Sequence, residues 1–135
     1  MPPLSQWYVK CSFGYLLLGF TFGALLLAHK GQPLHPALWG WLPAHIEWLL
    51  IGWVAQLALG VAFWILPRFW TEPRRGNVTG AYLALALLNL GIWLVTAGTV
   101  FRLSPWALVA GRLLEVAAAV AFAHAVWPRV VGRDG

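Results

Sequence analysis

The sequence predicts an all-α, polytopic membrane protein: a four-transmembrane-helix bundle with both termini in the cytoplasm. Apolar residues make up 61% of the chain and charged residues 10%, against roughly 45–50% and 25% in soluble domains. The apolar residues gather in four long stretches, and the basic residues gather in the loops on one side. A soluble fold of 135 residues could not bury so much apolar surface, so we interpret residues 1–135 as a single membrane domain in contact with the lipid bilayer.

Crossing the hydrocarbon core of a bilayer takes about 20 apolar residues in a helix. We predict spans at about residues 12–28, 43–66, 78–101 and 105–127, with Pro128 closing the fourth. The first span is expected to be retained rather than cleaved as a signal peptide, because its apolar run is too long and no small-x-small cleavage site follows it.

The basic residues predict the orientation of the spans, because cytoplasmic loops carry an excess of Lys and Arg. Four spans place both termini on one side. On that side lie Lys10, Arg68, Arg74, Arg75, Arg129 and Arg133. The opposite loops hold Lys30 and Arg102. We therefore expect a multi-pass protein of the inner (cytoplasmic) membrane whose excess positive charge orients it and does not bind nucleic acid.

Small and polar residues indicate how the helices meet. One face of the second span carries His45, Gly52, Gln56 and Gly60 at helical spacing. Glycine faces allow close helix packing in a membrane, where polar side chains also bond between helices. We expect Gln56 and Asn89 to form such interhelical hydrogen bonds.

Three charged residues lie within the predicted spans, where charges usually have a partner or a function. Arg112 and Glu115 have the i,i+3 spacing of an ion pair on the fourth span. The alternatives are a proton-carrying Glu115, or an Arg112 that pairs with a haem propionate or another anion. Glu47 lies about 200° around the helix from His45, so we expect it to reach Arg112 or the outer interface.

The four histidines lie at different depths. His45 opens the second span, whereas His124 lies near the cytoplasmic end of the fourth, so one chain cannot bring both to the same iron. His29 and His35 belong to the outer surface. The single cysteine, Cys11, leaves no intramolecular disulfide, thiolate zinc site or C-x-x-C-H haem attachment.

Residues 45–53, His-Ile-Glu-Trp-Leu-Leu-Ile-Gly-Trp, continue through Gln56 and Gly60 to Pro67-Arg68. This stretch of about 24 residues resembles a helix of haem-copper oxidase catalytic subunits, the superfamily that includes nitric oxide reductases. It is also similar to small four-span proteins related to subunit I of those oxidases. Glu47 stands where many of them have a second histidine. The chain also lacks an adjacent His-His pair and a third membrane histidine, so its ligand count excludes a complete haem-copper centre.

The resemblance implies a respiratory-chain protein that binds one b-type haem (haem b) through His45, for electron transfer or gas sensing. It places Gly52 and Gln56 beside the cofactor and Arg112 near a propionate. A second axial ligand could come from His29 or His35, or from a second His45 in a homodimer.

Two further hypotheses remain. The chain could be a haem-free accessory or assembly subunit that docks on the large subunit of a terminal oxidase or nitric oxide reductase. It could also be a transporter or quinone-binding protein that uses Arg112 and Glu115, although no inverted repeat supports transport. We do not expect catalysis by this chain alone.

Overall fold

The computed structural model describes residues 1–131, and all the regular structure in that range is helical. The elements in chain order are α1 (Pro3–Gly31), η1 (Pro36–Trp41), α2 (Leu42–Glu47), η2 (Trp48–Ala55), α3 (Gln56–Ile65), α4 (Val78–Val100) and α5 (Pro105–Val131). The segments from η1 to α3 follow one another as a single span, so the described chain has four helices long and apolar enough to cross a membrane. This confirms the predicted four-span architecture.

The helix ends differ from the predicted spans in several places, among them the start of the second span, which lies at Pro36 rather than near residue 43. The first helix begins at Pro3 rather than near residue 12, because proline is well tolerated in a first turn and nothing between it and the apolar run breaks the helix. The fourth continues through Pro128 to Val131, so the prediction that Pro128 closes it is wrong. Pro128 removes one backbone donor from the last turns of the helix, and only three residues of α5 follow it.

The second span contains an irregularity that the sequence did not indicate. It begins as a 3₁₀-helix at η1, becomes α-helical through α2, and is then a π-helix over the eight residues of η2 before α3 resumes. π-Helical segments are rare and occur frequently at functional sites. This one begins directly after Glu47.

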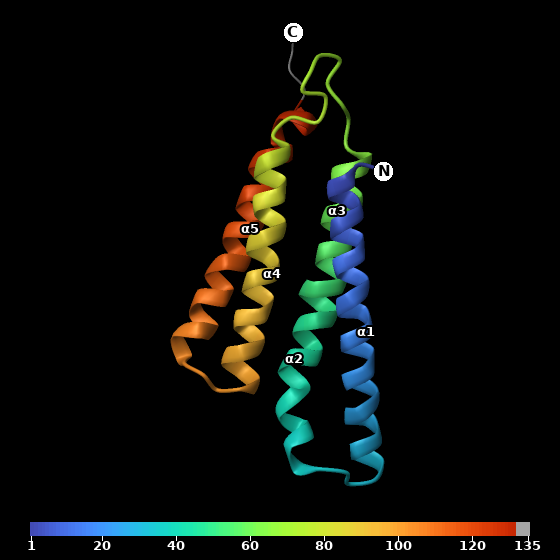
Figure 1. The fold of residues 1–135 in the computed structure, drawn as a ribbon, viewed down its shortest axis with the longest axis vertical. Coiled ribbons are helices and arrows are strands. Elements are labelled where there is room, and N and C mark those ends of the chain that lie inside the picture. The colour runs from blue at the N-terminus through green and yellow to red at the C-terminus, as the bar shows by residue number, and fades with distance from the viewer. Residues whose placement is uncertain (132–135) are drawn as a thin grey trace.

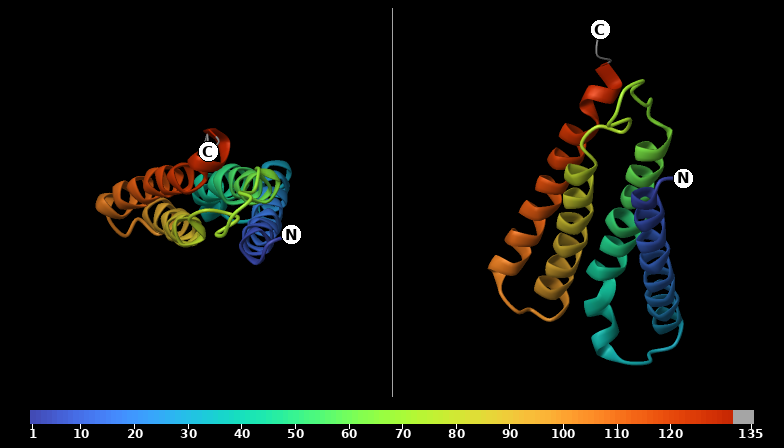
Figure 2. Two further views of the ribbon diagram at one scale, coloured as in Figure 1. Left: turned by 90° about the horizontal axis from the view of Figure 1, so that it is seen from above. Right: turned by 45° about the horizontal axis from the view of Figure 1, so that its top comes forward.

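The helices form two antiparallel hairpins (Figures 1 and 2). One pairs α1 with the second span and the other pairs α4 with α5. Glycines allow the close approach within each hairpin. A Cβ atom on Gly91 of α4 would lie 2.9 Å from the carbonyl oxygen of Gly111 on α5. A Cβ atom on Gly60 of α3 would lie 2.5 Å from Cβ of Tyr8 on α1.

Hydrogen bonds from side chains connect the two hairpins at several levels. They run from Tyr8 Oη to the Ala81 carbonyl (3.0 Å), from Tyr15 Oη to Asn89 Oδ1 (2.9 Å), and from Trp48 Nε1 to Thr96 Oγ1 (3.1 Å). In a membrane, where apolar burial does not drive helices together, such bonds help to select the pairing. The interhelical role predicted for Asn89 is confirmed.

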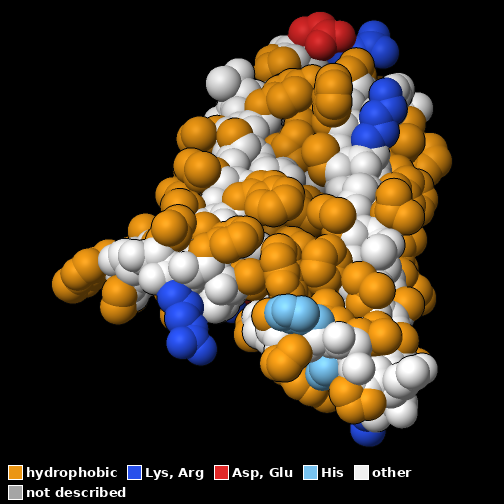
Figure 3. All heavy atoms as spheres, turned by 60° about the horizontal axis from the view of Figure 1, so that its bottom comes forward, with side chains coloured by type: hydrophobic (Ala, Val, Ile, Leu, Met, Phe, Trp, Pro, Cys, Tyr) orange, Lys and Arg blue, Asp and Glu red, His pale blue; other side chains and the backbone are white. Residues whose placement is uncertain are grey.

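The outer surface suits a lipid environment. Hydrophobic side chains cover most of the face in Figure 3, and the Lys and Arg side chains lie toward its two ends. The beginning of α1, the end of α5 and the loop between α3 and α4 share one end of the bundle (Figure 1).

Candidate functional site

The His45 imidazole lies in the interface between α2 and α1. Its Nδ1 is 2.8 Å from the carbonyl oxygen of Gly19. Because a carbonyl only accepts hydrogen bonds, Nδ1 carries the proton in the neutral ring and Nε2 keeps its lone pair. Gly23 leaves room for the ring, since a Cβ atom there would lie 2.6 Å from Cε1. The half-buried His45 therefore has the tautomer that a metal-ligating histidine needs.

The two candidate second ligands have the opposite tautomer. Nδ1 of His29 accepts hydrogen bonds from the backbone N–H of Leu34 (2.9 Å) and of His35 (3.3 Å). Nδ1 of His35 accepts from the N–H of Ala37 (3.2 Å) at the start of η1. A backbone N–H only donates, so in both neutral rings the proton is on Nε2. Both side chains thus stabilise the connection from α1 to η1.

Glu47, Arg112 and Glu115 form an ion-pair triad that joins the two hairpins. Arg112 Nη2 lies 2.8 Å from Glu47 Oε2, and Arg112 Nη1 lies 2.7 Å from Glu115 Oε2. The two carboxylate side chains are 5% and 11% exposed, whereas the Arg112 side chain is 51% exposed. The structure confirms the i,i+3 pair on α5 and the expected reach of Glu47 toward Arg112.

The charges within this triad are unequal, because two carboxyl groups share one guanidinium. Oε1 of Glu47 and Oε1 of Glu115 are buried without a hydrogen-bond partner in the part of the chain that the structure describes. The triad therefore has two mostly buried acids for one base. Both terminal nitrogens of Arg112 are already used by these acids, so a haem propionate would have to compete for that side chain.

Gln56 departs from its predicted role. Its side chain is fully buried, yet neither Nε2 nor Oε1 has a hydrogen-bond partner among residues 1–131. Tyr15 packs on Gly52 and Tyr8 on Gly60, so Gln56 lies at the level of α1 that contains Ser12. The Ser12 hydroxyl donates to the Val9 carbonyl of its own helix (2.8 Å) and does not bond to Gln56.

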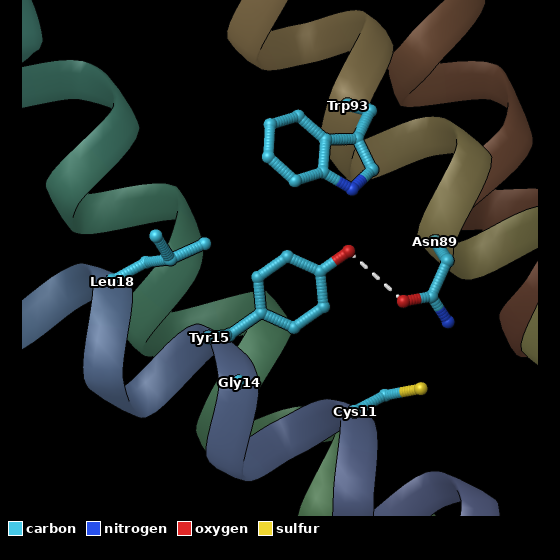
Figure 4. A pocket seen from close by; sticks show the side chains of 6 residues that line it. All are labelled: Cys11, Gly14, Tyr15, Leu18, Asn89 and Trp93. Atoms are coloured by element: carbon cyan, nitrogen blue, oxygen red, sulfur yellow. Dashed lines mark hydrogen bonds between the residues drawn. The ribbon is translucent and has the colours of Figure 1, made fainter.

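A small pocket of about 230 Å³ lies between α1 and α4 (Figure 4). It is lined by Cys11, Gly14, Tyr15, Leu18, Asn89 and Trp93. Two of its polar side chains are already engaged, since Tyr15 donates to Asn89 and Asn89 Nδ2 donates to the Leu85 carbonyl (2.8 Å). The pocket is smaller than typical cofactor sites, which span about 300–1,000 Å³. The sequence indicates this pocket only through Tyr15 and Asn89, two polar residues within otherwise apolar spans.

Comparison with known proteins gives no relative: no family model, curated protein or solved structure matches the chain. Within the described range, no three His, Cys, Asp or Glu side chains converge as they would around a metal ion. His124 is exposed on α5 beside Val120 and Trp127. The case for a function therefore depends on His45, the adjoining π-helix and the triad.

Proposed function

We propose that this chain is a respiratory-chain-associated inner-membrane protein that binds one b-type haem through Nε2 of His45. It would serve electron transfer or gas sensing, with both termini in the cytoplasm. The observation that carries the proposal is the hydrogen bond from His45 Nδ1 to the Gly19 carbonyl. When bound, haem iron supplies one-electron transfer and gas ligation.

The surroundings of His45 give partial support. Ligating histidines usually donate their other ring N–H to a carbonyl or carboxylate, which fixes the ring orientation. The π-helix that starts three residues after His45 carries Gly52, and Gln56 follows it with polar atoms that have no partner in the described part of the chain. Arg112 already pairs with two carboxylates, so we do not assign it as a partner of a haem propionate.

The ligand count of the proposed haem is one histidine per chain. His29 and His35 use their Nδ1 lone pairs on backbone N–H groups, so neither is assigned as the second ligand. His45 would hold the haem alone, with the iron open to a gas, or together with His45 of a second copy in a homodimer. The open position favours gas sensing, whereas two histidines favour electron transfer.

The first test is an absorption spectrum of detergent-purified protein, oxidised and then reduced with dithionite. We expect haem bands that His45→Ala removes and that His124→Ala, the matched control on α5, retains. His29→Ala and His35→Ala should also retain the bands. Circular dichroism would establish that each variant is folded. A folded wild-type protein with no visible bands, even after haem addition, would contradict the proposal.

A second candidate function is that of a haem-free accessory or assembly subunit of a terminal oxidase or nitric oxide reductase. The Arg112 side chain favours it, because it is 51% exposed. This residue is seven positions after Pro105, or roughly 10 Å along the helix axis. A charge near the bilayer centre costs at least about 2.5–3.5 kcal/mol, and a covering partner subunit would reduce that cost.

The accessory function predicts that a tagged chain, solubilised from its native membrane, copurifies with a large oxidase or reductase subunit. Deleting the gene should lower the amount of that complex. A chain that migrates only as a free homo-oligomer, together with unchanged oxidase content in the deletion strain, would contradict this candidate.

A further inference from the structure

Three arginines gather at the end of the bundle where α1 begins and α5 ends. Arg68 and Arg75 belong to the loop at residues 66–77, and Arg129 belongs to the last turns of α5. The loop is closed by a hydrogen bond from Phe69 N–H to the Arg74 carbonyl (2.8 Å), which brings its two flanking arginines together. We call these three residues and the cavity beside them the basic pocket.

Arg129 is 3% exposed, and part of its guanidinium has a structural role. Nε donates to the Pro67 carbonyl (2.9 Å), and Nη2 donates to the carbonyls of Phe63 (3.0 Å) and Leu66 (2.6 Å). The carbonyls at a helix C-terminus lack partners within the helix, so Arg129 caps α3. Nη1 of the same guanidinium is buried and has no partner among the described residues.

Arg75 also has a buried N–H donor for which the described residues supply no acceptor. This donor is Nη1 of its guanidinium. Burial lowers the pKa of Arg75, and the nearby positive charge of Arg68 lowers it further. The charges of Arg75 and Arg68 also act on Arg129. The three arginines are therefore close enough to repel one another.

The acid in the same loop does not neutralise this charge. Glu72 Oε1 pairs with Arg74 Nε (2.9 Å), and Glu72 Oε2 accepts from the Arg74 backbone N–H (3.0 Å). The Glu72 side chain is 77% exposed and is thus directed to solvent. Three arginines with this acid turned away leave an excess of positive charge at this end of the bundle, which favours an anion beside them.

The cavity beside these residues has room for such an anion. It measures about 410 Å³ and is lined by Arg68, Phe69, Trp70 and Arg74, so Arg68 is the one of the three arginines that borders it. Trp70 is fully exposed, and tryptophans favour the headgroup level of a bilayer. Several guanidinium forks around one anion match the oxygen geometry of a phosphate group.

We propose that the basic pocket binds the phosphate group of an anionic lipid headgroup. Its position at one end of four apolar helices places it at the level where such headgroups lie. The proposal is independent of the haem function, because it uses none of the residues around His45.

The test uses the full chain purified in a neutral detergent. Thermal unfolding is followed after adding phosphatidylglycerol, phosphatidylcholine or inorganic phosphate at equal ionic strength, and native mass spectrometry detects bound lipid. We expect phosphatidylglycerol alone to raise Tm. Arg75→Gln and Arg68→Gln should each weaken its binding about tenfold, as expected for losing a charged hydrogen bond. Arg102→Gln, at the opposite end of the bundle, is the matched control and should bind normally.

The change in Tm caused by Arg75→Gln, measured with and without lipid, distinguishes a lipid-binding role from a structural one. Without lipid, Arg75→Gln should raise Tm, because it removes repulsion; with phosphatidylglycerol it should lower Tm relative to wild type. Equal protection by phosphatidylcholine, or unchanged lipid binding in both arginine variants, would overturn the proposal. Arginine-dependent protection by inorganic phosphate alone would overturn the lipid as the source and assign the basic pocket to a free anion. Arg129 is left intact, since its substitution would also uncap α3.

Discussion

Arg112→Gln is expected to lower the free energy of unfolding by about 1–3 kcal/mol, less than the cost of breaking a fully buried ion pair because the Arg112 side chain is 51% exposed. The substitution leaves Glu47 and Glu115, which are 5% and 11% exposed, close together without their shared cation. It also removes the connection that the triad makes between α2 and α5. Unfolding in mixed micelles, followed by circular dichroism, measures the loss.

Neutralising the acids should reverse this effect. In the triple variant Arg112→Gln, Glu47→Gln, Glu115→Gln no buried charge remains, and replacing a whole buried ion-pair network is often close to neutral. We expect the triple variant to recover most of the lost stability. Glu47→Gln alone should cost less than Arg112→Gln, because Arg112 keeps Glu115. A stable Arg112→Gln variant, or a triple variant no better than the single one, would show that the triad does not hold the hairpins together.

Gly111→Ala is expected to destabilise the α4–α5 hairpin by about 1–3 kcal/mol, as overpacking of a tight interface does. A Cβ atom at Gly111 would lie 2.8 Å from the backbone nitrogen of Val95 and 2.9 Å from the carbonyl oxygen of Gly91. Backbone atoms cannot rotate away as a side chain can, so the two helices would have to separate.

The matched control is Gly14→Ala on α1, where a new Cβ atom would meet nothing within 4 Å. Alanine has the higher helix propensity, by roughly 1 kcal/mol, so this control should be neutral or stabilising. Thermal unfolding of both variants in the same detergent compares them directly. Equal Tm changes for the two substitutions would contradict the close α4–α5 contact.

The sequence could predict the features that depend on composition or on spacing within one helix. The four spans follow from apolar length, and the pair of Arg112 with Glu115 follows from i,i+3 spacing. The contact of Glu47 with Arg112 could also be predicted from the sequence, because both residues lie near the same end of their spans and Glu47 faces away from His45.

The remaining features depend on neighbours that spacing does not reveal. The tautomer of His45 is fixed by a backbone carbonyl of α1, and no side-chain pattern predicts that hydrogen bond. Gln56 makes none of the expected interhelical hydrogen bonds within residues 1–131, and the Ser12 hydroxyl at the same level of α1 bonds within its own helix. The arginines of the basic pocket were predicted only as orienting charges, since their meeting requires the closed loop between α3 and α4.

The hydrogen bonds between the hairpins also bear on how the chain is assembled during synthesis. Both ends of each hairpin lie at the same end of the bundle (Figure 1), so the first hairpin can insert before the second is made. Until then, the hydroxyls of Tyr8 and Tyr15 lack the acceptors that α4 supplies in the complete fold. When the second hairpin inserts, the Ala81 carbonyl and the Asn89 side chain accept these hydrogen bonds. Association of the two hairpins is therefore favoured over their separation in lipid.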